Sequence, residues 1–79
     1  MLQVASLLAF ERAWLNRPQH DGAKEAAIRE RFGCSPTVYY QQLVAILDTR
    51  EALEVDAVTV GVVRRRLARG QRQRVTRSG

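Results

Sequence analysis

The sequence predicts an all-α protein: a compact helical bundle of four to five helices that contains a helix-turn-helix and carries a basic C-terminal tail. Three observations lead to this prediction. Apolar residues make up 46% of the chain and recur mainly at helical spacing. Both prolines and Gly33 fall where apolar runs begin or end, as helix boundaries require. No second β-rich run exists to pair with the valines near residue 60, which disfavours a sheet.

Seventy-nine residues allow one small domain, which buries only about 60% of the surface of its unfolded chain. We expect a helix-turn-helix domain over residues 1–69 and a flexible basic tail over residues 70–79. The predicted helices are 2–16, 22–32, 35–47, 49–53 and 57–69.

The first predicted helix carries its apolar residues at helical spacing. Val4, Leu7 and Leu8 lie on one face, and Trp14 follows further along the helix. Pro18 ends the helix because it lacks a backbone donor and disfavours a helical residue before it.

The second and third predicted helices meet at a tight turn. Asp21 is a good N-cap for the second helix, and Gly33 suits the left-handed residue that ends it. Ser35 and Pro36 then predict a new helix, because serine caps a helix and proline suits its first turn. The residues expected to face inward are Ala23, Ala27, Ile28 and Phe32 in the second helix and Tyr39, Leu43, Ile46 and Leu47 in the third.

Two acidic residues predict the starts of the last helices. Asp48 opens a sequence that resembles a capping box and starts a short helical turn. Asp56 can cap the final helix, whose inward residues would be Val58, Val62, Val63 and Leu67. The valines at 58, 60 and 62 also alternate as in a strand, but we prefer the helix because a strand would have no partner.

Charge is distributed unevenly along the chain. Residues 1–63 contain six basic and eight acidic residues, a net charge of −2, whereas residues 64–79 contain seven arginines and no acid, a net charge of +7. A near-neutral body with a strongly cationic end favours an anionic partner, nucleic acid before a membrane surface. The alternative interpretation is a solvated terminus that only keeps the protein soluble.

The segment from Gly22 to Leu47 carries the functional prediction. In a helix-turn-helix, the second helix presents its N-terminal residues to the major groove. Thr37 and Gln41 could therefore hydrogen-bond base edges or phosphates, while the terminal arginines bind phosphates of any sequence. The predicted DNA-binding residues are Lys24, Ser35, Pro36, Thr37, Val38, Tyr40, Gln41, Arg64, Arg65, Arg66, Arg69, Arg72, Arg74 and Arg77.

Two other interpretations of this segment stay open. It could be a tight helical hairpin that only packs a bundle, since such pairs are common in helical proteins. It could also be a protein-binding surface, because the exposed part of the helix that begins at Ser35 contains tyrosine and valine but no arginine or lysine. On the DNA-binding interpretation, guanine recognition and much of the affinity would have to come from elsewhere.

The composition argues against several classes of function. The lone cysteine, Cys34, cannot form an internal disulfide, and with the lone His20 it makes no zinc cluster, so we expect no metal or cofactor. The sequence contains no catalytic constellation or phosphate-binding loop, so we expect no enzyme. No apolar run approaches the roughly 20 residues that span a bilayer, and Met1–Phe10 does not resemble a signal peptide. A reducing cytoplasm is the expected location.

Three stretches are distinctive in combination: Leu8–Trp14 with its Phe-Glu-Arg and Trp, Gly22–Glu30, and Ser35–Leu43 with its Ser-Pro-Thr and Tyr-Tyr. Together they resemble a family of small proteins of unknown function from actinobacteria and their phages. The resemblance covers roughly Leu7–Arg69 and implies a helix-turn-helix protein without implying an activity. Such sequences often have arginine after Ser-Pro-Thr, where this chain has Val38.

These observations predict a DNA-binding protein, a transcriptional regulator of actinobacterial or phage origin associated with the nucleoid. The helix that begins at Ser35 would enter the major groove of double-stranded DNA. The alternative is a protein-interaction adaptor that binds the transcription machinery or another acidic partner. A homodimer is a further hypothesis, with Leu8, Phe10 or Leu15 at its interface. No membrane partner is expected.

Overall fold

Four helices form the chain in the computed structural model, which describes the backbone of residues 2–17 and 22–78 and the side chains of residues 2–17 and 22–69. The helices are α1 (Val4–Trp14), α2 (Ala23–Phe32), α3 (Pro36–Leu47) and α4 (Arg50–Ser78). The described backbone contains no strand. The predicted all-α bundle is therefore confirmed.

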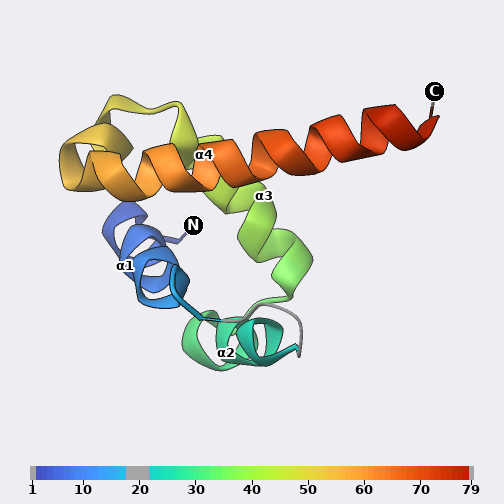
Figure 1. Ribbon diagram of the computed structural model, residues 1–79. Helices are drawn as coiled ribbons and strands as arrows, with labels where there is room; N and C mark the ends of the chain where they lie inside the picture. Colours follow the sequence, from blue (N-terminus) through green and yellow to red (C-terminus); the bar gives the residue numbers. More distant parts are fainter. Residues whose placement is uncertain (1, 18–21, 79) are drawn as a thin grey trace.

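The arrangement of the bundle follows from which helices pack together. Helix α4 packs against α1 and α3, and α2 packs against α3 at the side of the molecule away from α4 (Figure 1). The last turns of α4, drawn in orange to red, extend past α3 and away from the other helices (Figure 1). The C-terminal half of α4, where the arginines are concentrated, therefore begins beside α3 and continues outward.

The core lies where α1, α3 and α4 meet, with one contribution from α2. The four apolar residues predicted to face inward from α3 are all buried, as are Leu7 and Leu8 of α1. Leu8 is fully buried, so it is not available for the hypothetical dimer interface. The buried apolar residues are Leu7, Leu8, Ile28, Tyr39, Leu43, Ile46, Leu47, Ala52, Val60 and Val63.

The turn between α2 and α3 has the local chemistry that the sequence predicts. Gly33 ends α2 with φ of 67°, in the left-handed region that favours glycine. The Ser35 side chain caps α3 by accepting a hydrogen bond from the backbone N–H of Val38 at 3.2 Å, and Pro36 follows in the first turn. Gly22 precedes α2, and the predicted cap Asp21 lies outside the described residues.

The inward face of α2 differs from the prediction. Ile28 is fully buried as expected, but Ala23 is exposed, and the buried position beside it belongs to Lys24. An alanine contributes little buried apolar area, so the alanines of α2 constrain its rotation weakly. The ion pair between Lys24 and Glu11 of α1 fixes the face instead.

The boundary that the sequence predicts between the last two helices lies inside α4. Asp56 has φ of −161° and ψ of 82°, which are not helical angles. Its carboxylate accepts hydrogen bonds from the backbone N–H of Thr59 at 3.1 Å and from the Thr59 hydroxyl at 2.6 Å, as a cap does. The predicted cap at Asp56 is therefore confirmed.

Three further predictions about this region are corrected. Thr49, rather than Asp48, caps the first part of α4, because its hydroxyl accepts from the Ala52 N–H at 3.2 Å. Val58 is 75% exposed, and the helix buries Thr59 and Val60 in its place. The helical backbone continues to Ser78 instead of ending at residue 69. The added segment is rich in arginine and glutamine, which favour helices, and contains no proline.

No helix within the described ranges is long and apolar enough to cross a membrane.

Candidate nucleic-acid interface

One side of α3 is exposed because the opposite side enters the core. The four buried residues of α3 recur at three- and four-residue spacing, so the positions between them point outward. Thr37 and Gln41 are exposed, Val38 is 39% exposed and Val44 is 52% exposed. Ser35 precedes them as an exposed cap, and Pro36 and Tyr40 are half-buried at the edge of this surface.

Part of this exposed side forms a shallow hollow. Thr37, Tyr40, Gln41 and Val44 line a space of about 560 Å³ on α3. We call these four residues, together with Val38, the α3 face. It has hydroxyl and amide groups for hydrogen bonding and valine methyl groups for apolar contact, but no charged side chain.

The arginines of α4 lie around its buried stripe. Arg64, Arg65, Arg66 and Arg69 are all exposed. At 100° per residue, Arg64 and Arg66 flank the stripe formed by Val60, Val63 and the half-buried Leu67, on opposite sides. Arg65 and Arg69 project from the outward side of the helix, away from this stripe.

Two of these arginines make contacts within the protein. The guanidinium of Arg64 lies 3.7 Å from the carboxylate of Asp48. The guanidinium of Arg66 donates to the carbonyl oxygen of Leu15 at 3.0 Å. Both contacts are exposed. An exposed ion pair contributes about 0–1 kcal/mol and a hydrogen bond about 0.5–1.5 kcal/mol, so either guanidinium can be redirected to a phosphate at little cost.

Shared residues join the α3 face to the arginines. Tyr40 lines the hollow on α3 and also lines a second pocket together with Arg66. Val44 lines the same hollow and a third pocket together with Arg64. The α3 face is therefore bordered by two cationic side chains of α4. The structure brings the α3 face, Arg64 and Arg66 onto one continuous surface, with the Arg66 guanidinium directed toward Leu15 at the end of α1. Arg65 and Arg69 lie on the other side of α4.

Lys24 is the predicted site residue that lies elsewhere. It is buried, and its ammonium lies 3.0 Å from the carboxylate of Glu11 on α1. The ammonium also lies 5.5 Å from the centre of the Tyr40 ring. The structure therefore gives the Lys24 cation an internal partner, and Lys24 is not part of the DNA-binding surface that we propose below.

Glu11 joins three helices through a buried polar cluster. Its carboxylate accepts hydrogen bonds from Lys24 of α2 and from the hydroxyl of Tyr39 of α3, the latter at 2.5 Å. Burial, followed by the hydrogen bond to Glu11, raises the pKa of the Tyr39 hydroxyl above its ordinary value, so it remains a neutral donor. The Tyr39 hydroxyl is therefore internal rather than at the edge of the core.

The sequence does contain a sign of this cluster. Glu11 follows Leu7 by four residues and Leu8 by three, so it lies on the same face of α1 as the two leucines. An acidic residue on a buried helical face requires a partner. The sequence reveals the position of the acid but not its partner, because Lys24 and Tyr39 reach it only through the tertiary fold.

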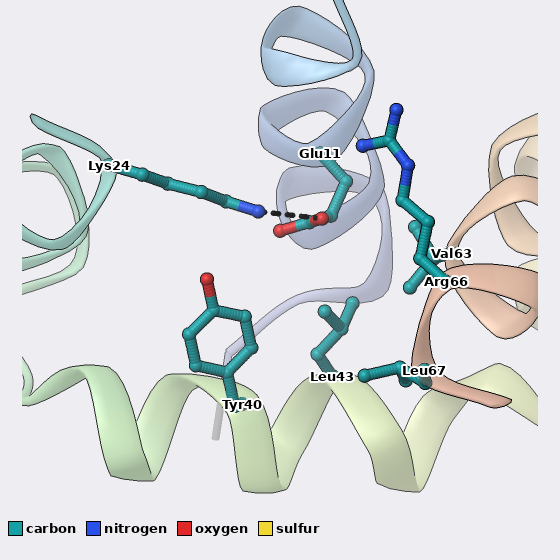
Figure 2. Close-up of a pocket in the computed structure, with 7 residues that line it drawn as sticks. All are labelled: Glu11, Lys24, Tyr40, Leu43, Val63, Arg66 and Leu67. Atoms are coloured by element: carbon teal, nitrogen blue, oxygen red, sulfur yellow. Dashed lines mark hydrogen bonds and ion pairs between the residues drawn. The ribbon is translucent and has the colours of Figure 1, made fainter. Parts of the chain in front are cut away.

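The second pocket lies between this cluster and α4, with a volume of about 260 Å³. Figure 2 shows the Lys24–Glu11 ion pair on one side and Val63, Arg66 and Leu67 of α4 on the other. The Tyr40 ring rises from α3 toward the ion pair (Figure 2). Tyr40 therefore belongs to the α3 face and also borders the buried cluster.

The remaining predictions concern the end of α4 and metal binding. The side chains of Arg72, Arg74 and Arg77 lie outside the described residues, although the backbone there is helical. No group of three or more histidine, cysteine, aspartate or glutamate side chains that could hold a metal ion occurs in the described part of the chain.

A family model described as a protein of unknown function, DUF3263, matches residues 3–77. The chain belongs to the DUF3263 family. No curated protein and no solved structure matches it. The DUF3263 match includes α1, α2, α3 and nearly all of α4, so the α3 face and the arginines both lie within the family region.

Proposed function

We propose that this DUF3263 protein binds double-stranded DNA, with α2, the turn at Gly33 and α3 acting as a helix-turn-helix. The observation that carries the proposal is the continuous surface formed by the α3 face and the arginines of α4 that border it. The first provides groups that can contact base edges, and the second provides cations for the phosphates beside them.

The local geometry supports this role for α3. The cap at Ser35 and the left-handed Gly33 fix where α3 begins and how it leaves α2. Its first two turns leave Thr37, Val38 and Gln41 exposed. Recognition helices of helix-turn-helix proteins contact bases from these N-terminal positions.

The charge distribution supports DNA over an uncharged partner. The four described arginines of residues 64–69 are exposed, and Arg65 and Arg69 make no ion pair within the described ranges. The remainder of the protein up to residue 63 has a net charge of −2. Attraction to a polyanion would therefore be concentrated on α4 and would orient the protein.

This proposal makes the protein a transcriptional regulator of actinobacterial or phage type. Such a regulator acts on the nucleoid in the cytoplasm. Neither role requires an enzymatic activity or a cofactor.

Binding to a labelled 20-bp duplex across a salt series tests the proposal. Each neutralised phosphate contributes about −0.9 to the slope of log K against log salt. Engagement of Arg64 and Arg66, which border the α3 face, therefore contributes about −1.8 to the slope. An Arg64→Ala/Arg66→Ala variant should lower the magnitude of the slope by about 2, because each phosphate that is no longer neutralised reduces it by about 1.

The matched control for this variant is Arg12→Ala/Arg50→Ala. These two exposed arginines pair with Asp56 and Glu54, so their replacement removes the same charge from another part of the surface. The control should keep the wild-type slope. A wild-type protein that fails to bind at low salt, or binds with a slope near zero, would contradict DNA binding.

The hollow on α3 also favours a second candidate, a protein-interaction adaptor. Tyr40 and Val44 line a space of about 560 Å³ without a charged residue, as the centre of a protein interface does. This alternative predicts a stoichiometric partner, from the transcription machinery or with another acidic surface, that survives nuclease treatment. A Val44→Glu substitution should remove that partner, whereas Val58→Glu, at another exposed valine, should retain it.

A further inference from the structure

The α3 face differs from a guanine-reading surface in its chemistry. Guanine is most often recognised in the major groove by arginine or lysine, which donate two hydrogen bonds to its O6 and N7 atoms. Helix α3 has no arginine or lysine between Pro36 and Leu47. The α3 face carries the amide of Gln41, the hydroxyl of Thr37, the edge of Tyr40 and two valines.

We propose that the α3 face recognises A·T base pairs through the major groove, an inference that rests on the proposed DNA-binding function. The amide of Gln41 pairs with adenine N6 and N7, the geometry in which glutamine binds this base. The methyl groups of Val44, Val38 and Thr37 contact the C5 methyl of thymine, a group that cytosine and guanine lack.

The spacing of these side chains fits a short run of base pairs. Thr37, Gln41 and Val44 recur at intervals of four and three residues, so they lie along one side of α3 and line one hollow. At 1.5 Å per residue, the seven-residue separation covers about 10.5 Å, or about three base-pair steps of 3.4 Å. The α3 face is therefore large enough for about three consecutive A·T pairs.

The arginines are placed to position the protein rather than to read guanine. Arg64 and Arg66 border the α3 face from another helix, and Arg65 and Arg69 project from the far side of that helix. Contacts from such arginines to phosphates fix the orientation of the protein on DNA and carry no sequence information. The preference for a base pair consequently depends on the uncharged groups of α3.

Selection of the full chain on a randomised 20-bp duplex library, followed by binding assays on base analogues, tests the inference. We expect a selected site with a core of about three A·T pairs. Replacing these pairs by G·C should weaken binding by about 5- to 150-fold for each base pair that a side chain recognises specifically. Replacing thymine by uracil removes only the C5 methyl and should weaken binding about fourfold for each buried methyl.

Inosine·cytosine pairs distinguish recognition through the major groove from recognition through the minor groove. Such a pair presents the major-groove pattern of G·C and the minor-groove pattern of A·T. If α3 reads the major groove, inosine·cytosine should bind as weakly as G·C. Binding equal to that of A·T would overturn the inference, because the preference would then arise from the minor groove or from DNA shape.

Single substitutions test whether the preference for A·T pairs depends on side chains of α3. Gln41→Ala and Val44→Ala should each reduce the discrimination between A·T and G·C sites while leaving the salt slope unchanged. Gln3→Ala and Val58→Ala are the matched controls, since both residues are exposed and lie outside the α3 face. Salt-dependent binding without A·T preference would overturn this inference and leave DNA binding intact, whereas no duplex binding would overturn both.

Discussion

Removal of Glu11 should destabilise the protein severely, whereas removal of Glu11 and Lys24 together should destabilise it less. Glu11→Leu leaves the buried ammonium of Lys24 and the hydroxyl of Tyr39 without their acceptor. Loss of one partner from a buried ion pair costs about 3–5 kcal/mol. A Glu11→Leu/Lys24→Met variant replaces both charges by apolar groups of similar size and so removes the cost of the unpaired ammonium. It leaves only the Tyr39 hydroxyl without an acceptor, which costs about 1–3 kcal/mol.

The size of the protein makes this effect easy to detect. At about 0.05–0.15 kcal/mol per residue, a 79-residue chain has a free energy of unfolding of about 4–12 kcal/mol. The single substitution therefore removes a large part of the total stability. Tyr39→Phe provides a milder test, since it removes one hydrogen bond to a charged group and should cost about 1.5–3 kcal/mol.

Urea unfolding followed by circular dichroism in the far ultraviolet measures these differences. We expect the midpoint to fall in the order wild type, Tyr39→Phe, Glu11→Leu, and to recover in part in the double variant, where the Tyr39 hydroxyl still lacks its acceptor. Glu54→Ala is the control, because it removes an exposed i,i+4 pair with Arg50 that contributes at most about 0.5 kcal/mol. A Glu11→Leu protein as stable as wild type, or a double variant less stable than the single one, would refute the role assigned to this cluster.

Three further predictions concern the turn, α4 and the α3 face. Gly33→Ala should lower the free energy of unfolding by about 1–2 kcal/mol in urea titrations. No atom lies near the added Cβ, so this loss comes from the positive φ alone. An unchanged urea midpoint would contradict the prediction. Hydrogen bonds from the side chain and backbone of Thr59 lower the pKa of Asp56 from 3.8, so this carboxylate stabilises the fold above about pH 4 and loses that contribution as the pH falls toward its folded-state pKa. Asp56→Asn should therefore lose less stability than wild type between pH 6 and pH 3, and equal losses would argue against the assignment. Val38→Arg should tighten duplex binding and steepen the salt slope by about 1, whereas unchanged binding in anisotropy titrations would place this residue outside the interface.

Much of the fold can be predicted because its boundaries depend on local chemistry. The left-handed Gly33, the cap at Ser35 and the cap at Asp56 each act within four residues of their position in the chain. Such short-range interactions are visible in sequence. The competition between Asp48 and Thr49 is also local, but both residues suit a helix N-terminus, and sequence alone does not distinguish them.

The candidate site is predicted less completely because part of it depends on tertiary contacts. The exposed residues of α3 follow from helical spacing, as do the arginines of α4. Lys24 carries the positive charge that a phosphate contact requires, and only its distance to Glu11 reveals that it pairs inside the protein. The same holds for the border between α3 and α4, since Tyr40 and Arg66 are 26 positions apart in sequence and share one pocket.

Titration of the ¹⁵N-labelled protein with the selected duplex, followed by NMR, tests DNA recognition by α3 most directly. We predict that the amide signals of Thr37, Gln41 and Val44 and the side-chain Nε–H signals of Arg64 and Arg66 shift together as DNA is added. The signals of Arg12 and Arg50, which lie outside the proposed interface, should stay in place. Shifts confined to other helices, with the α3 face unchanged, would contradict DNA recognition by α3.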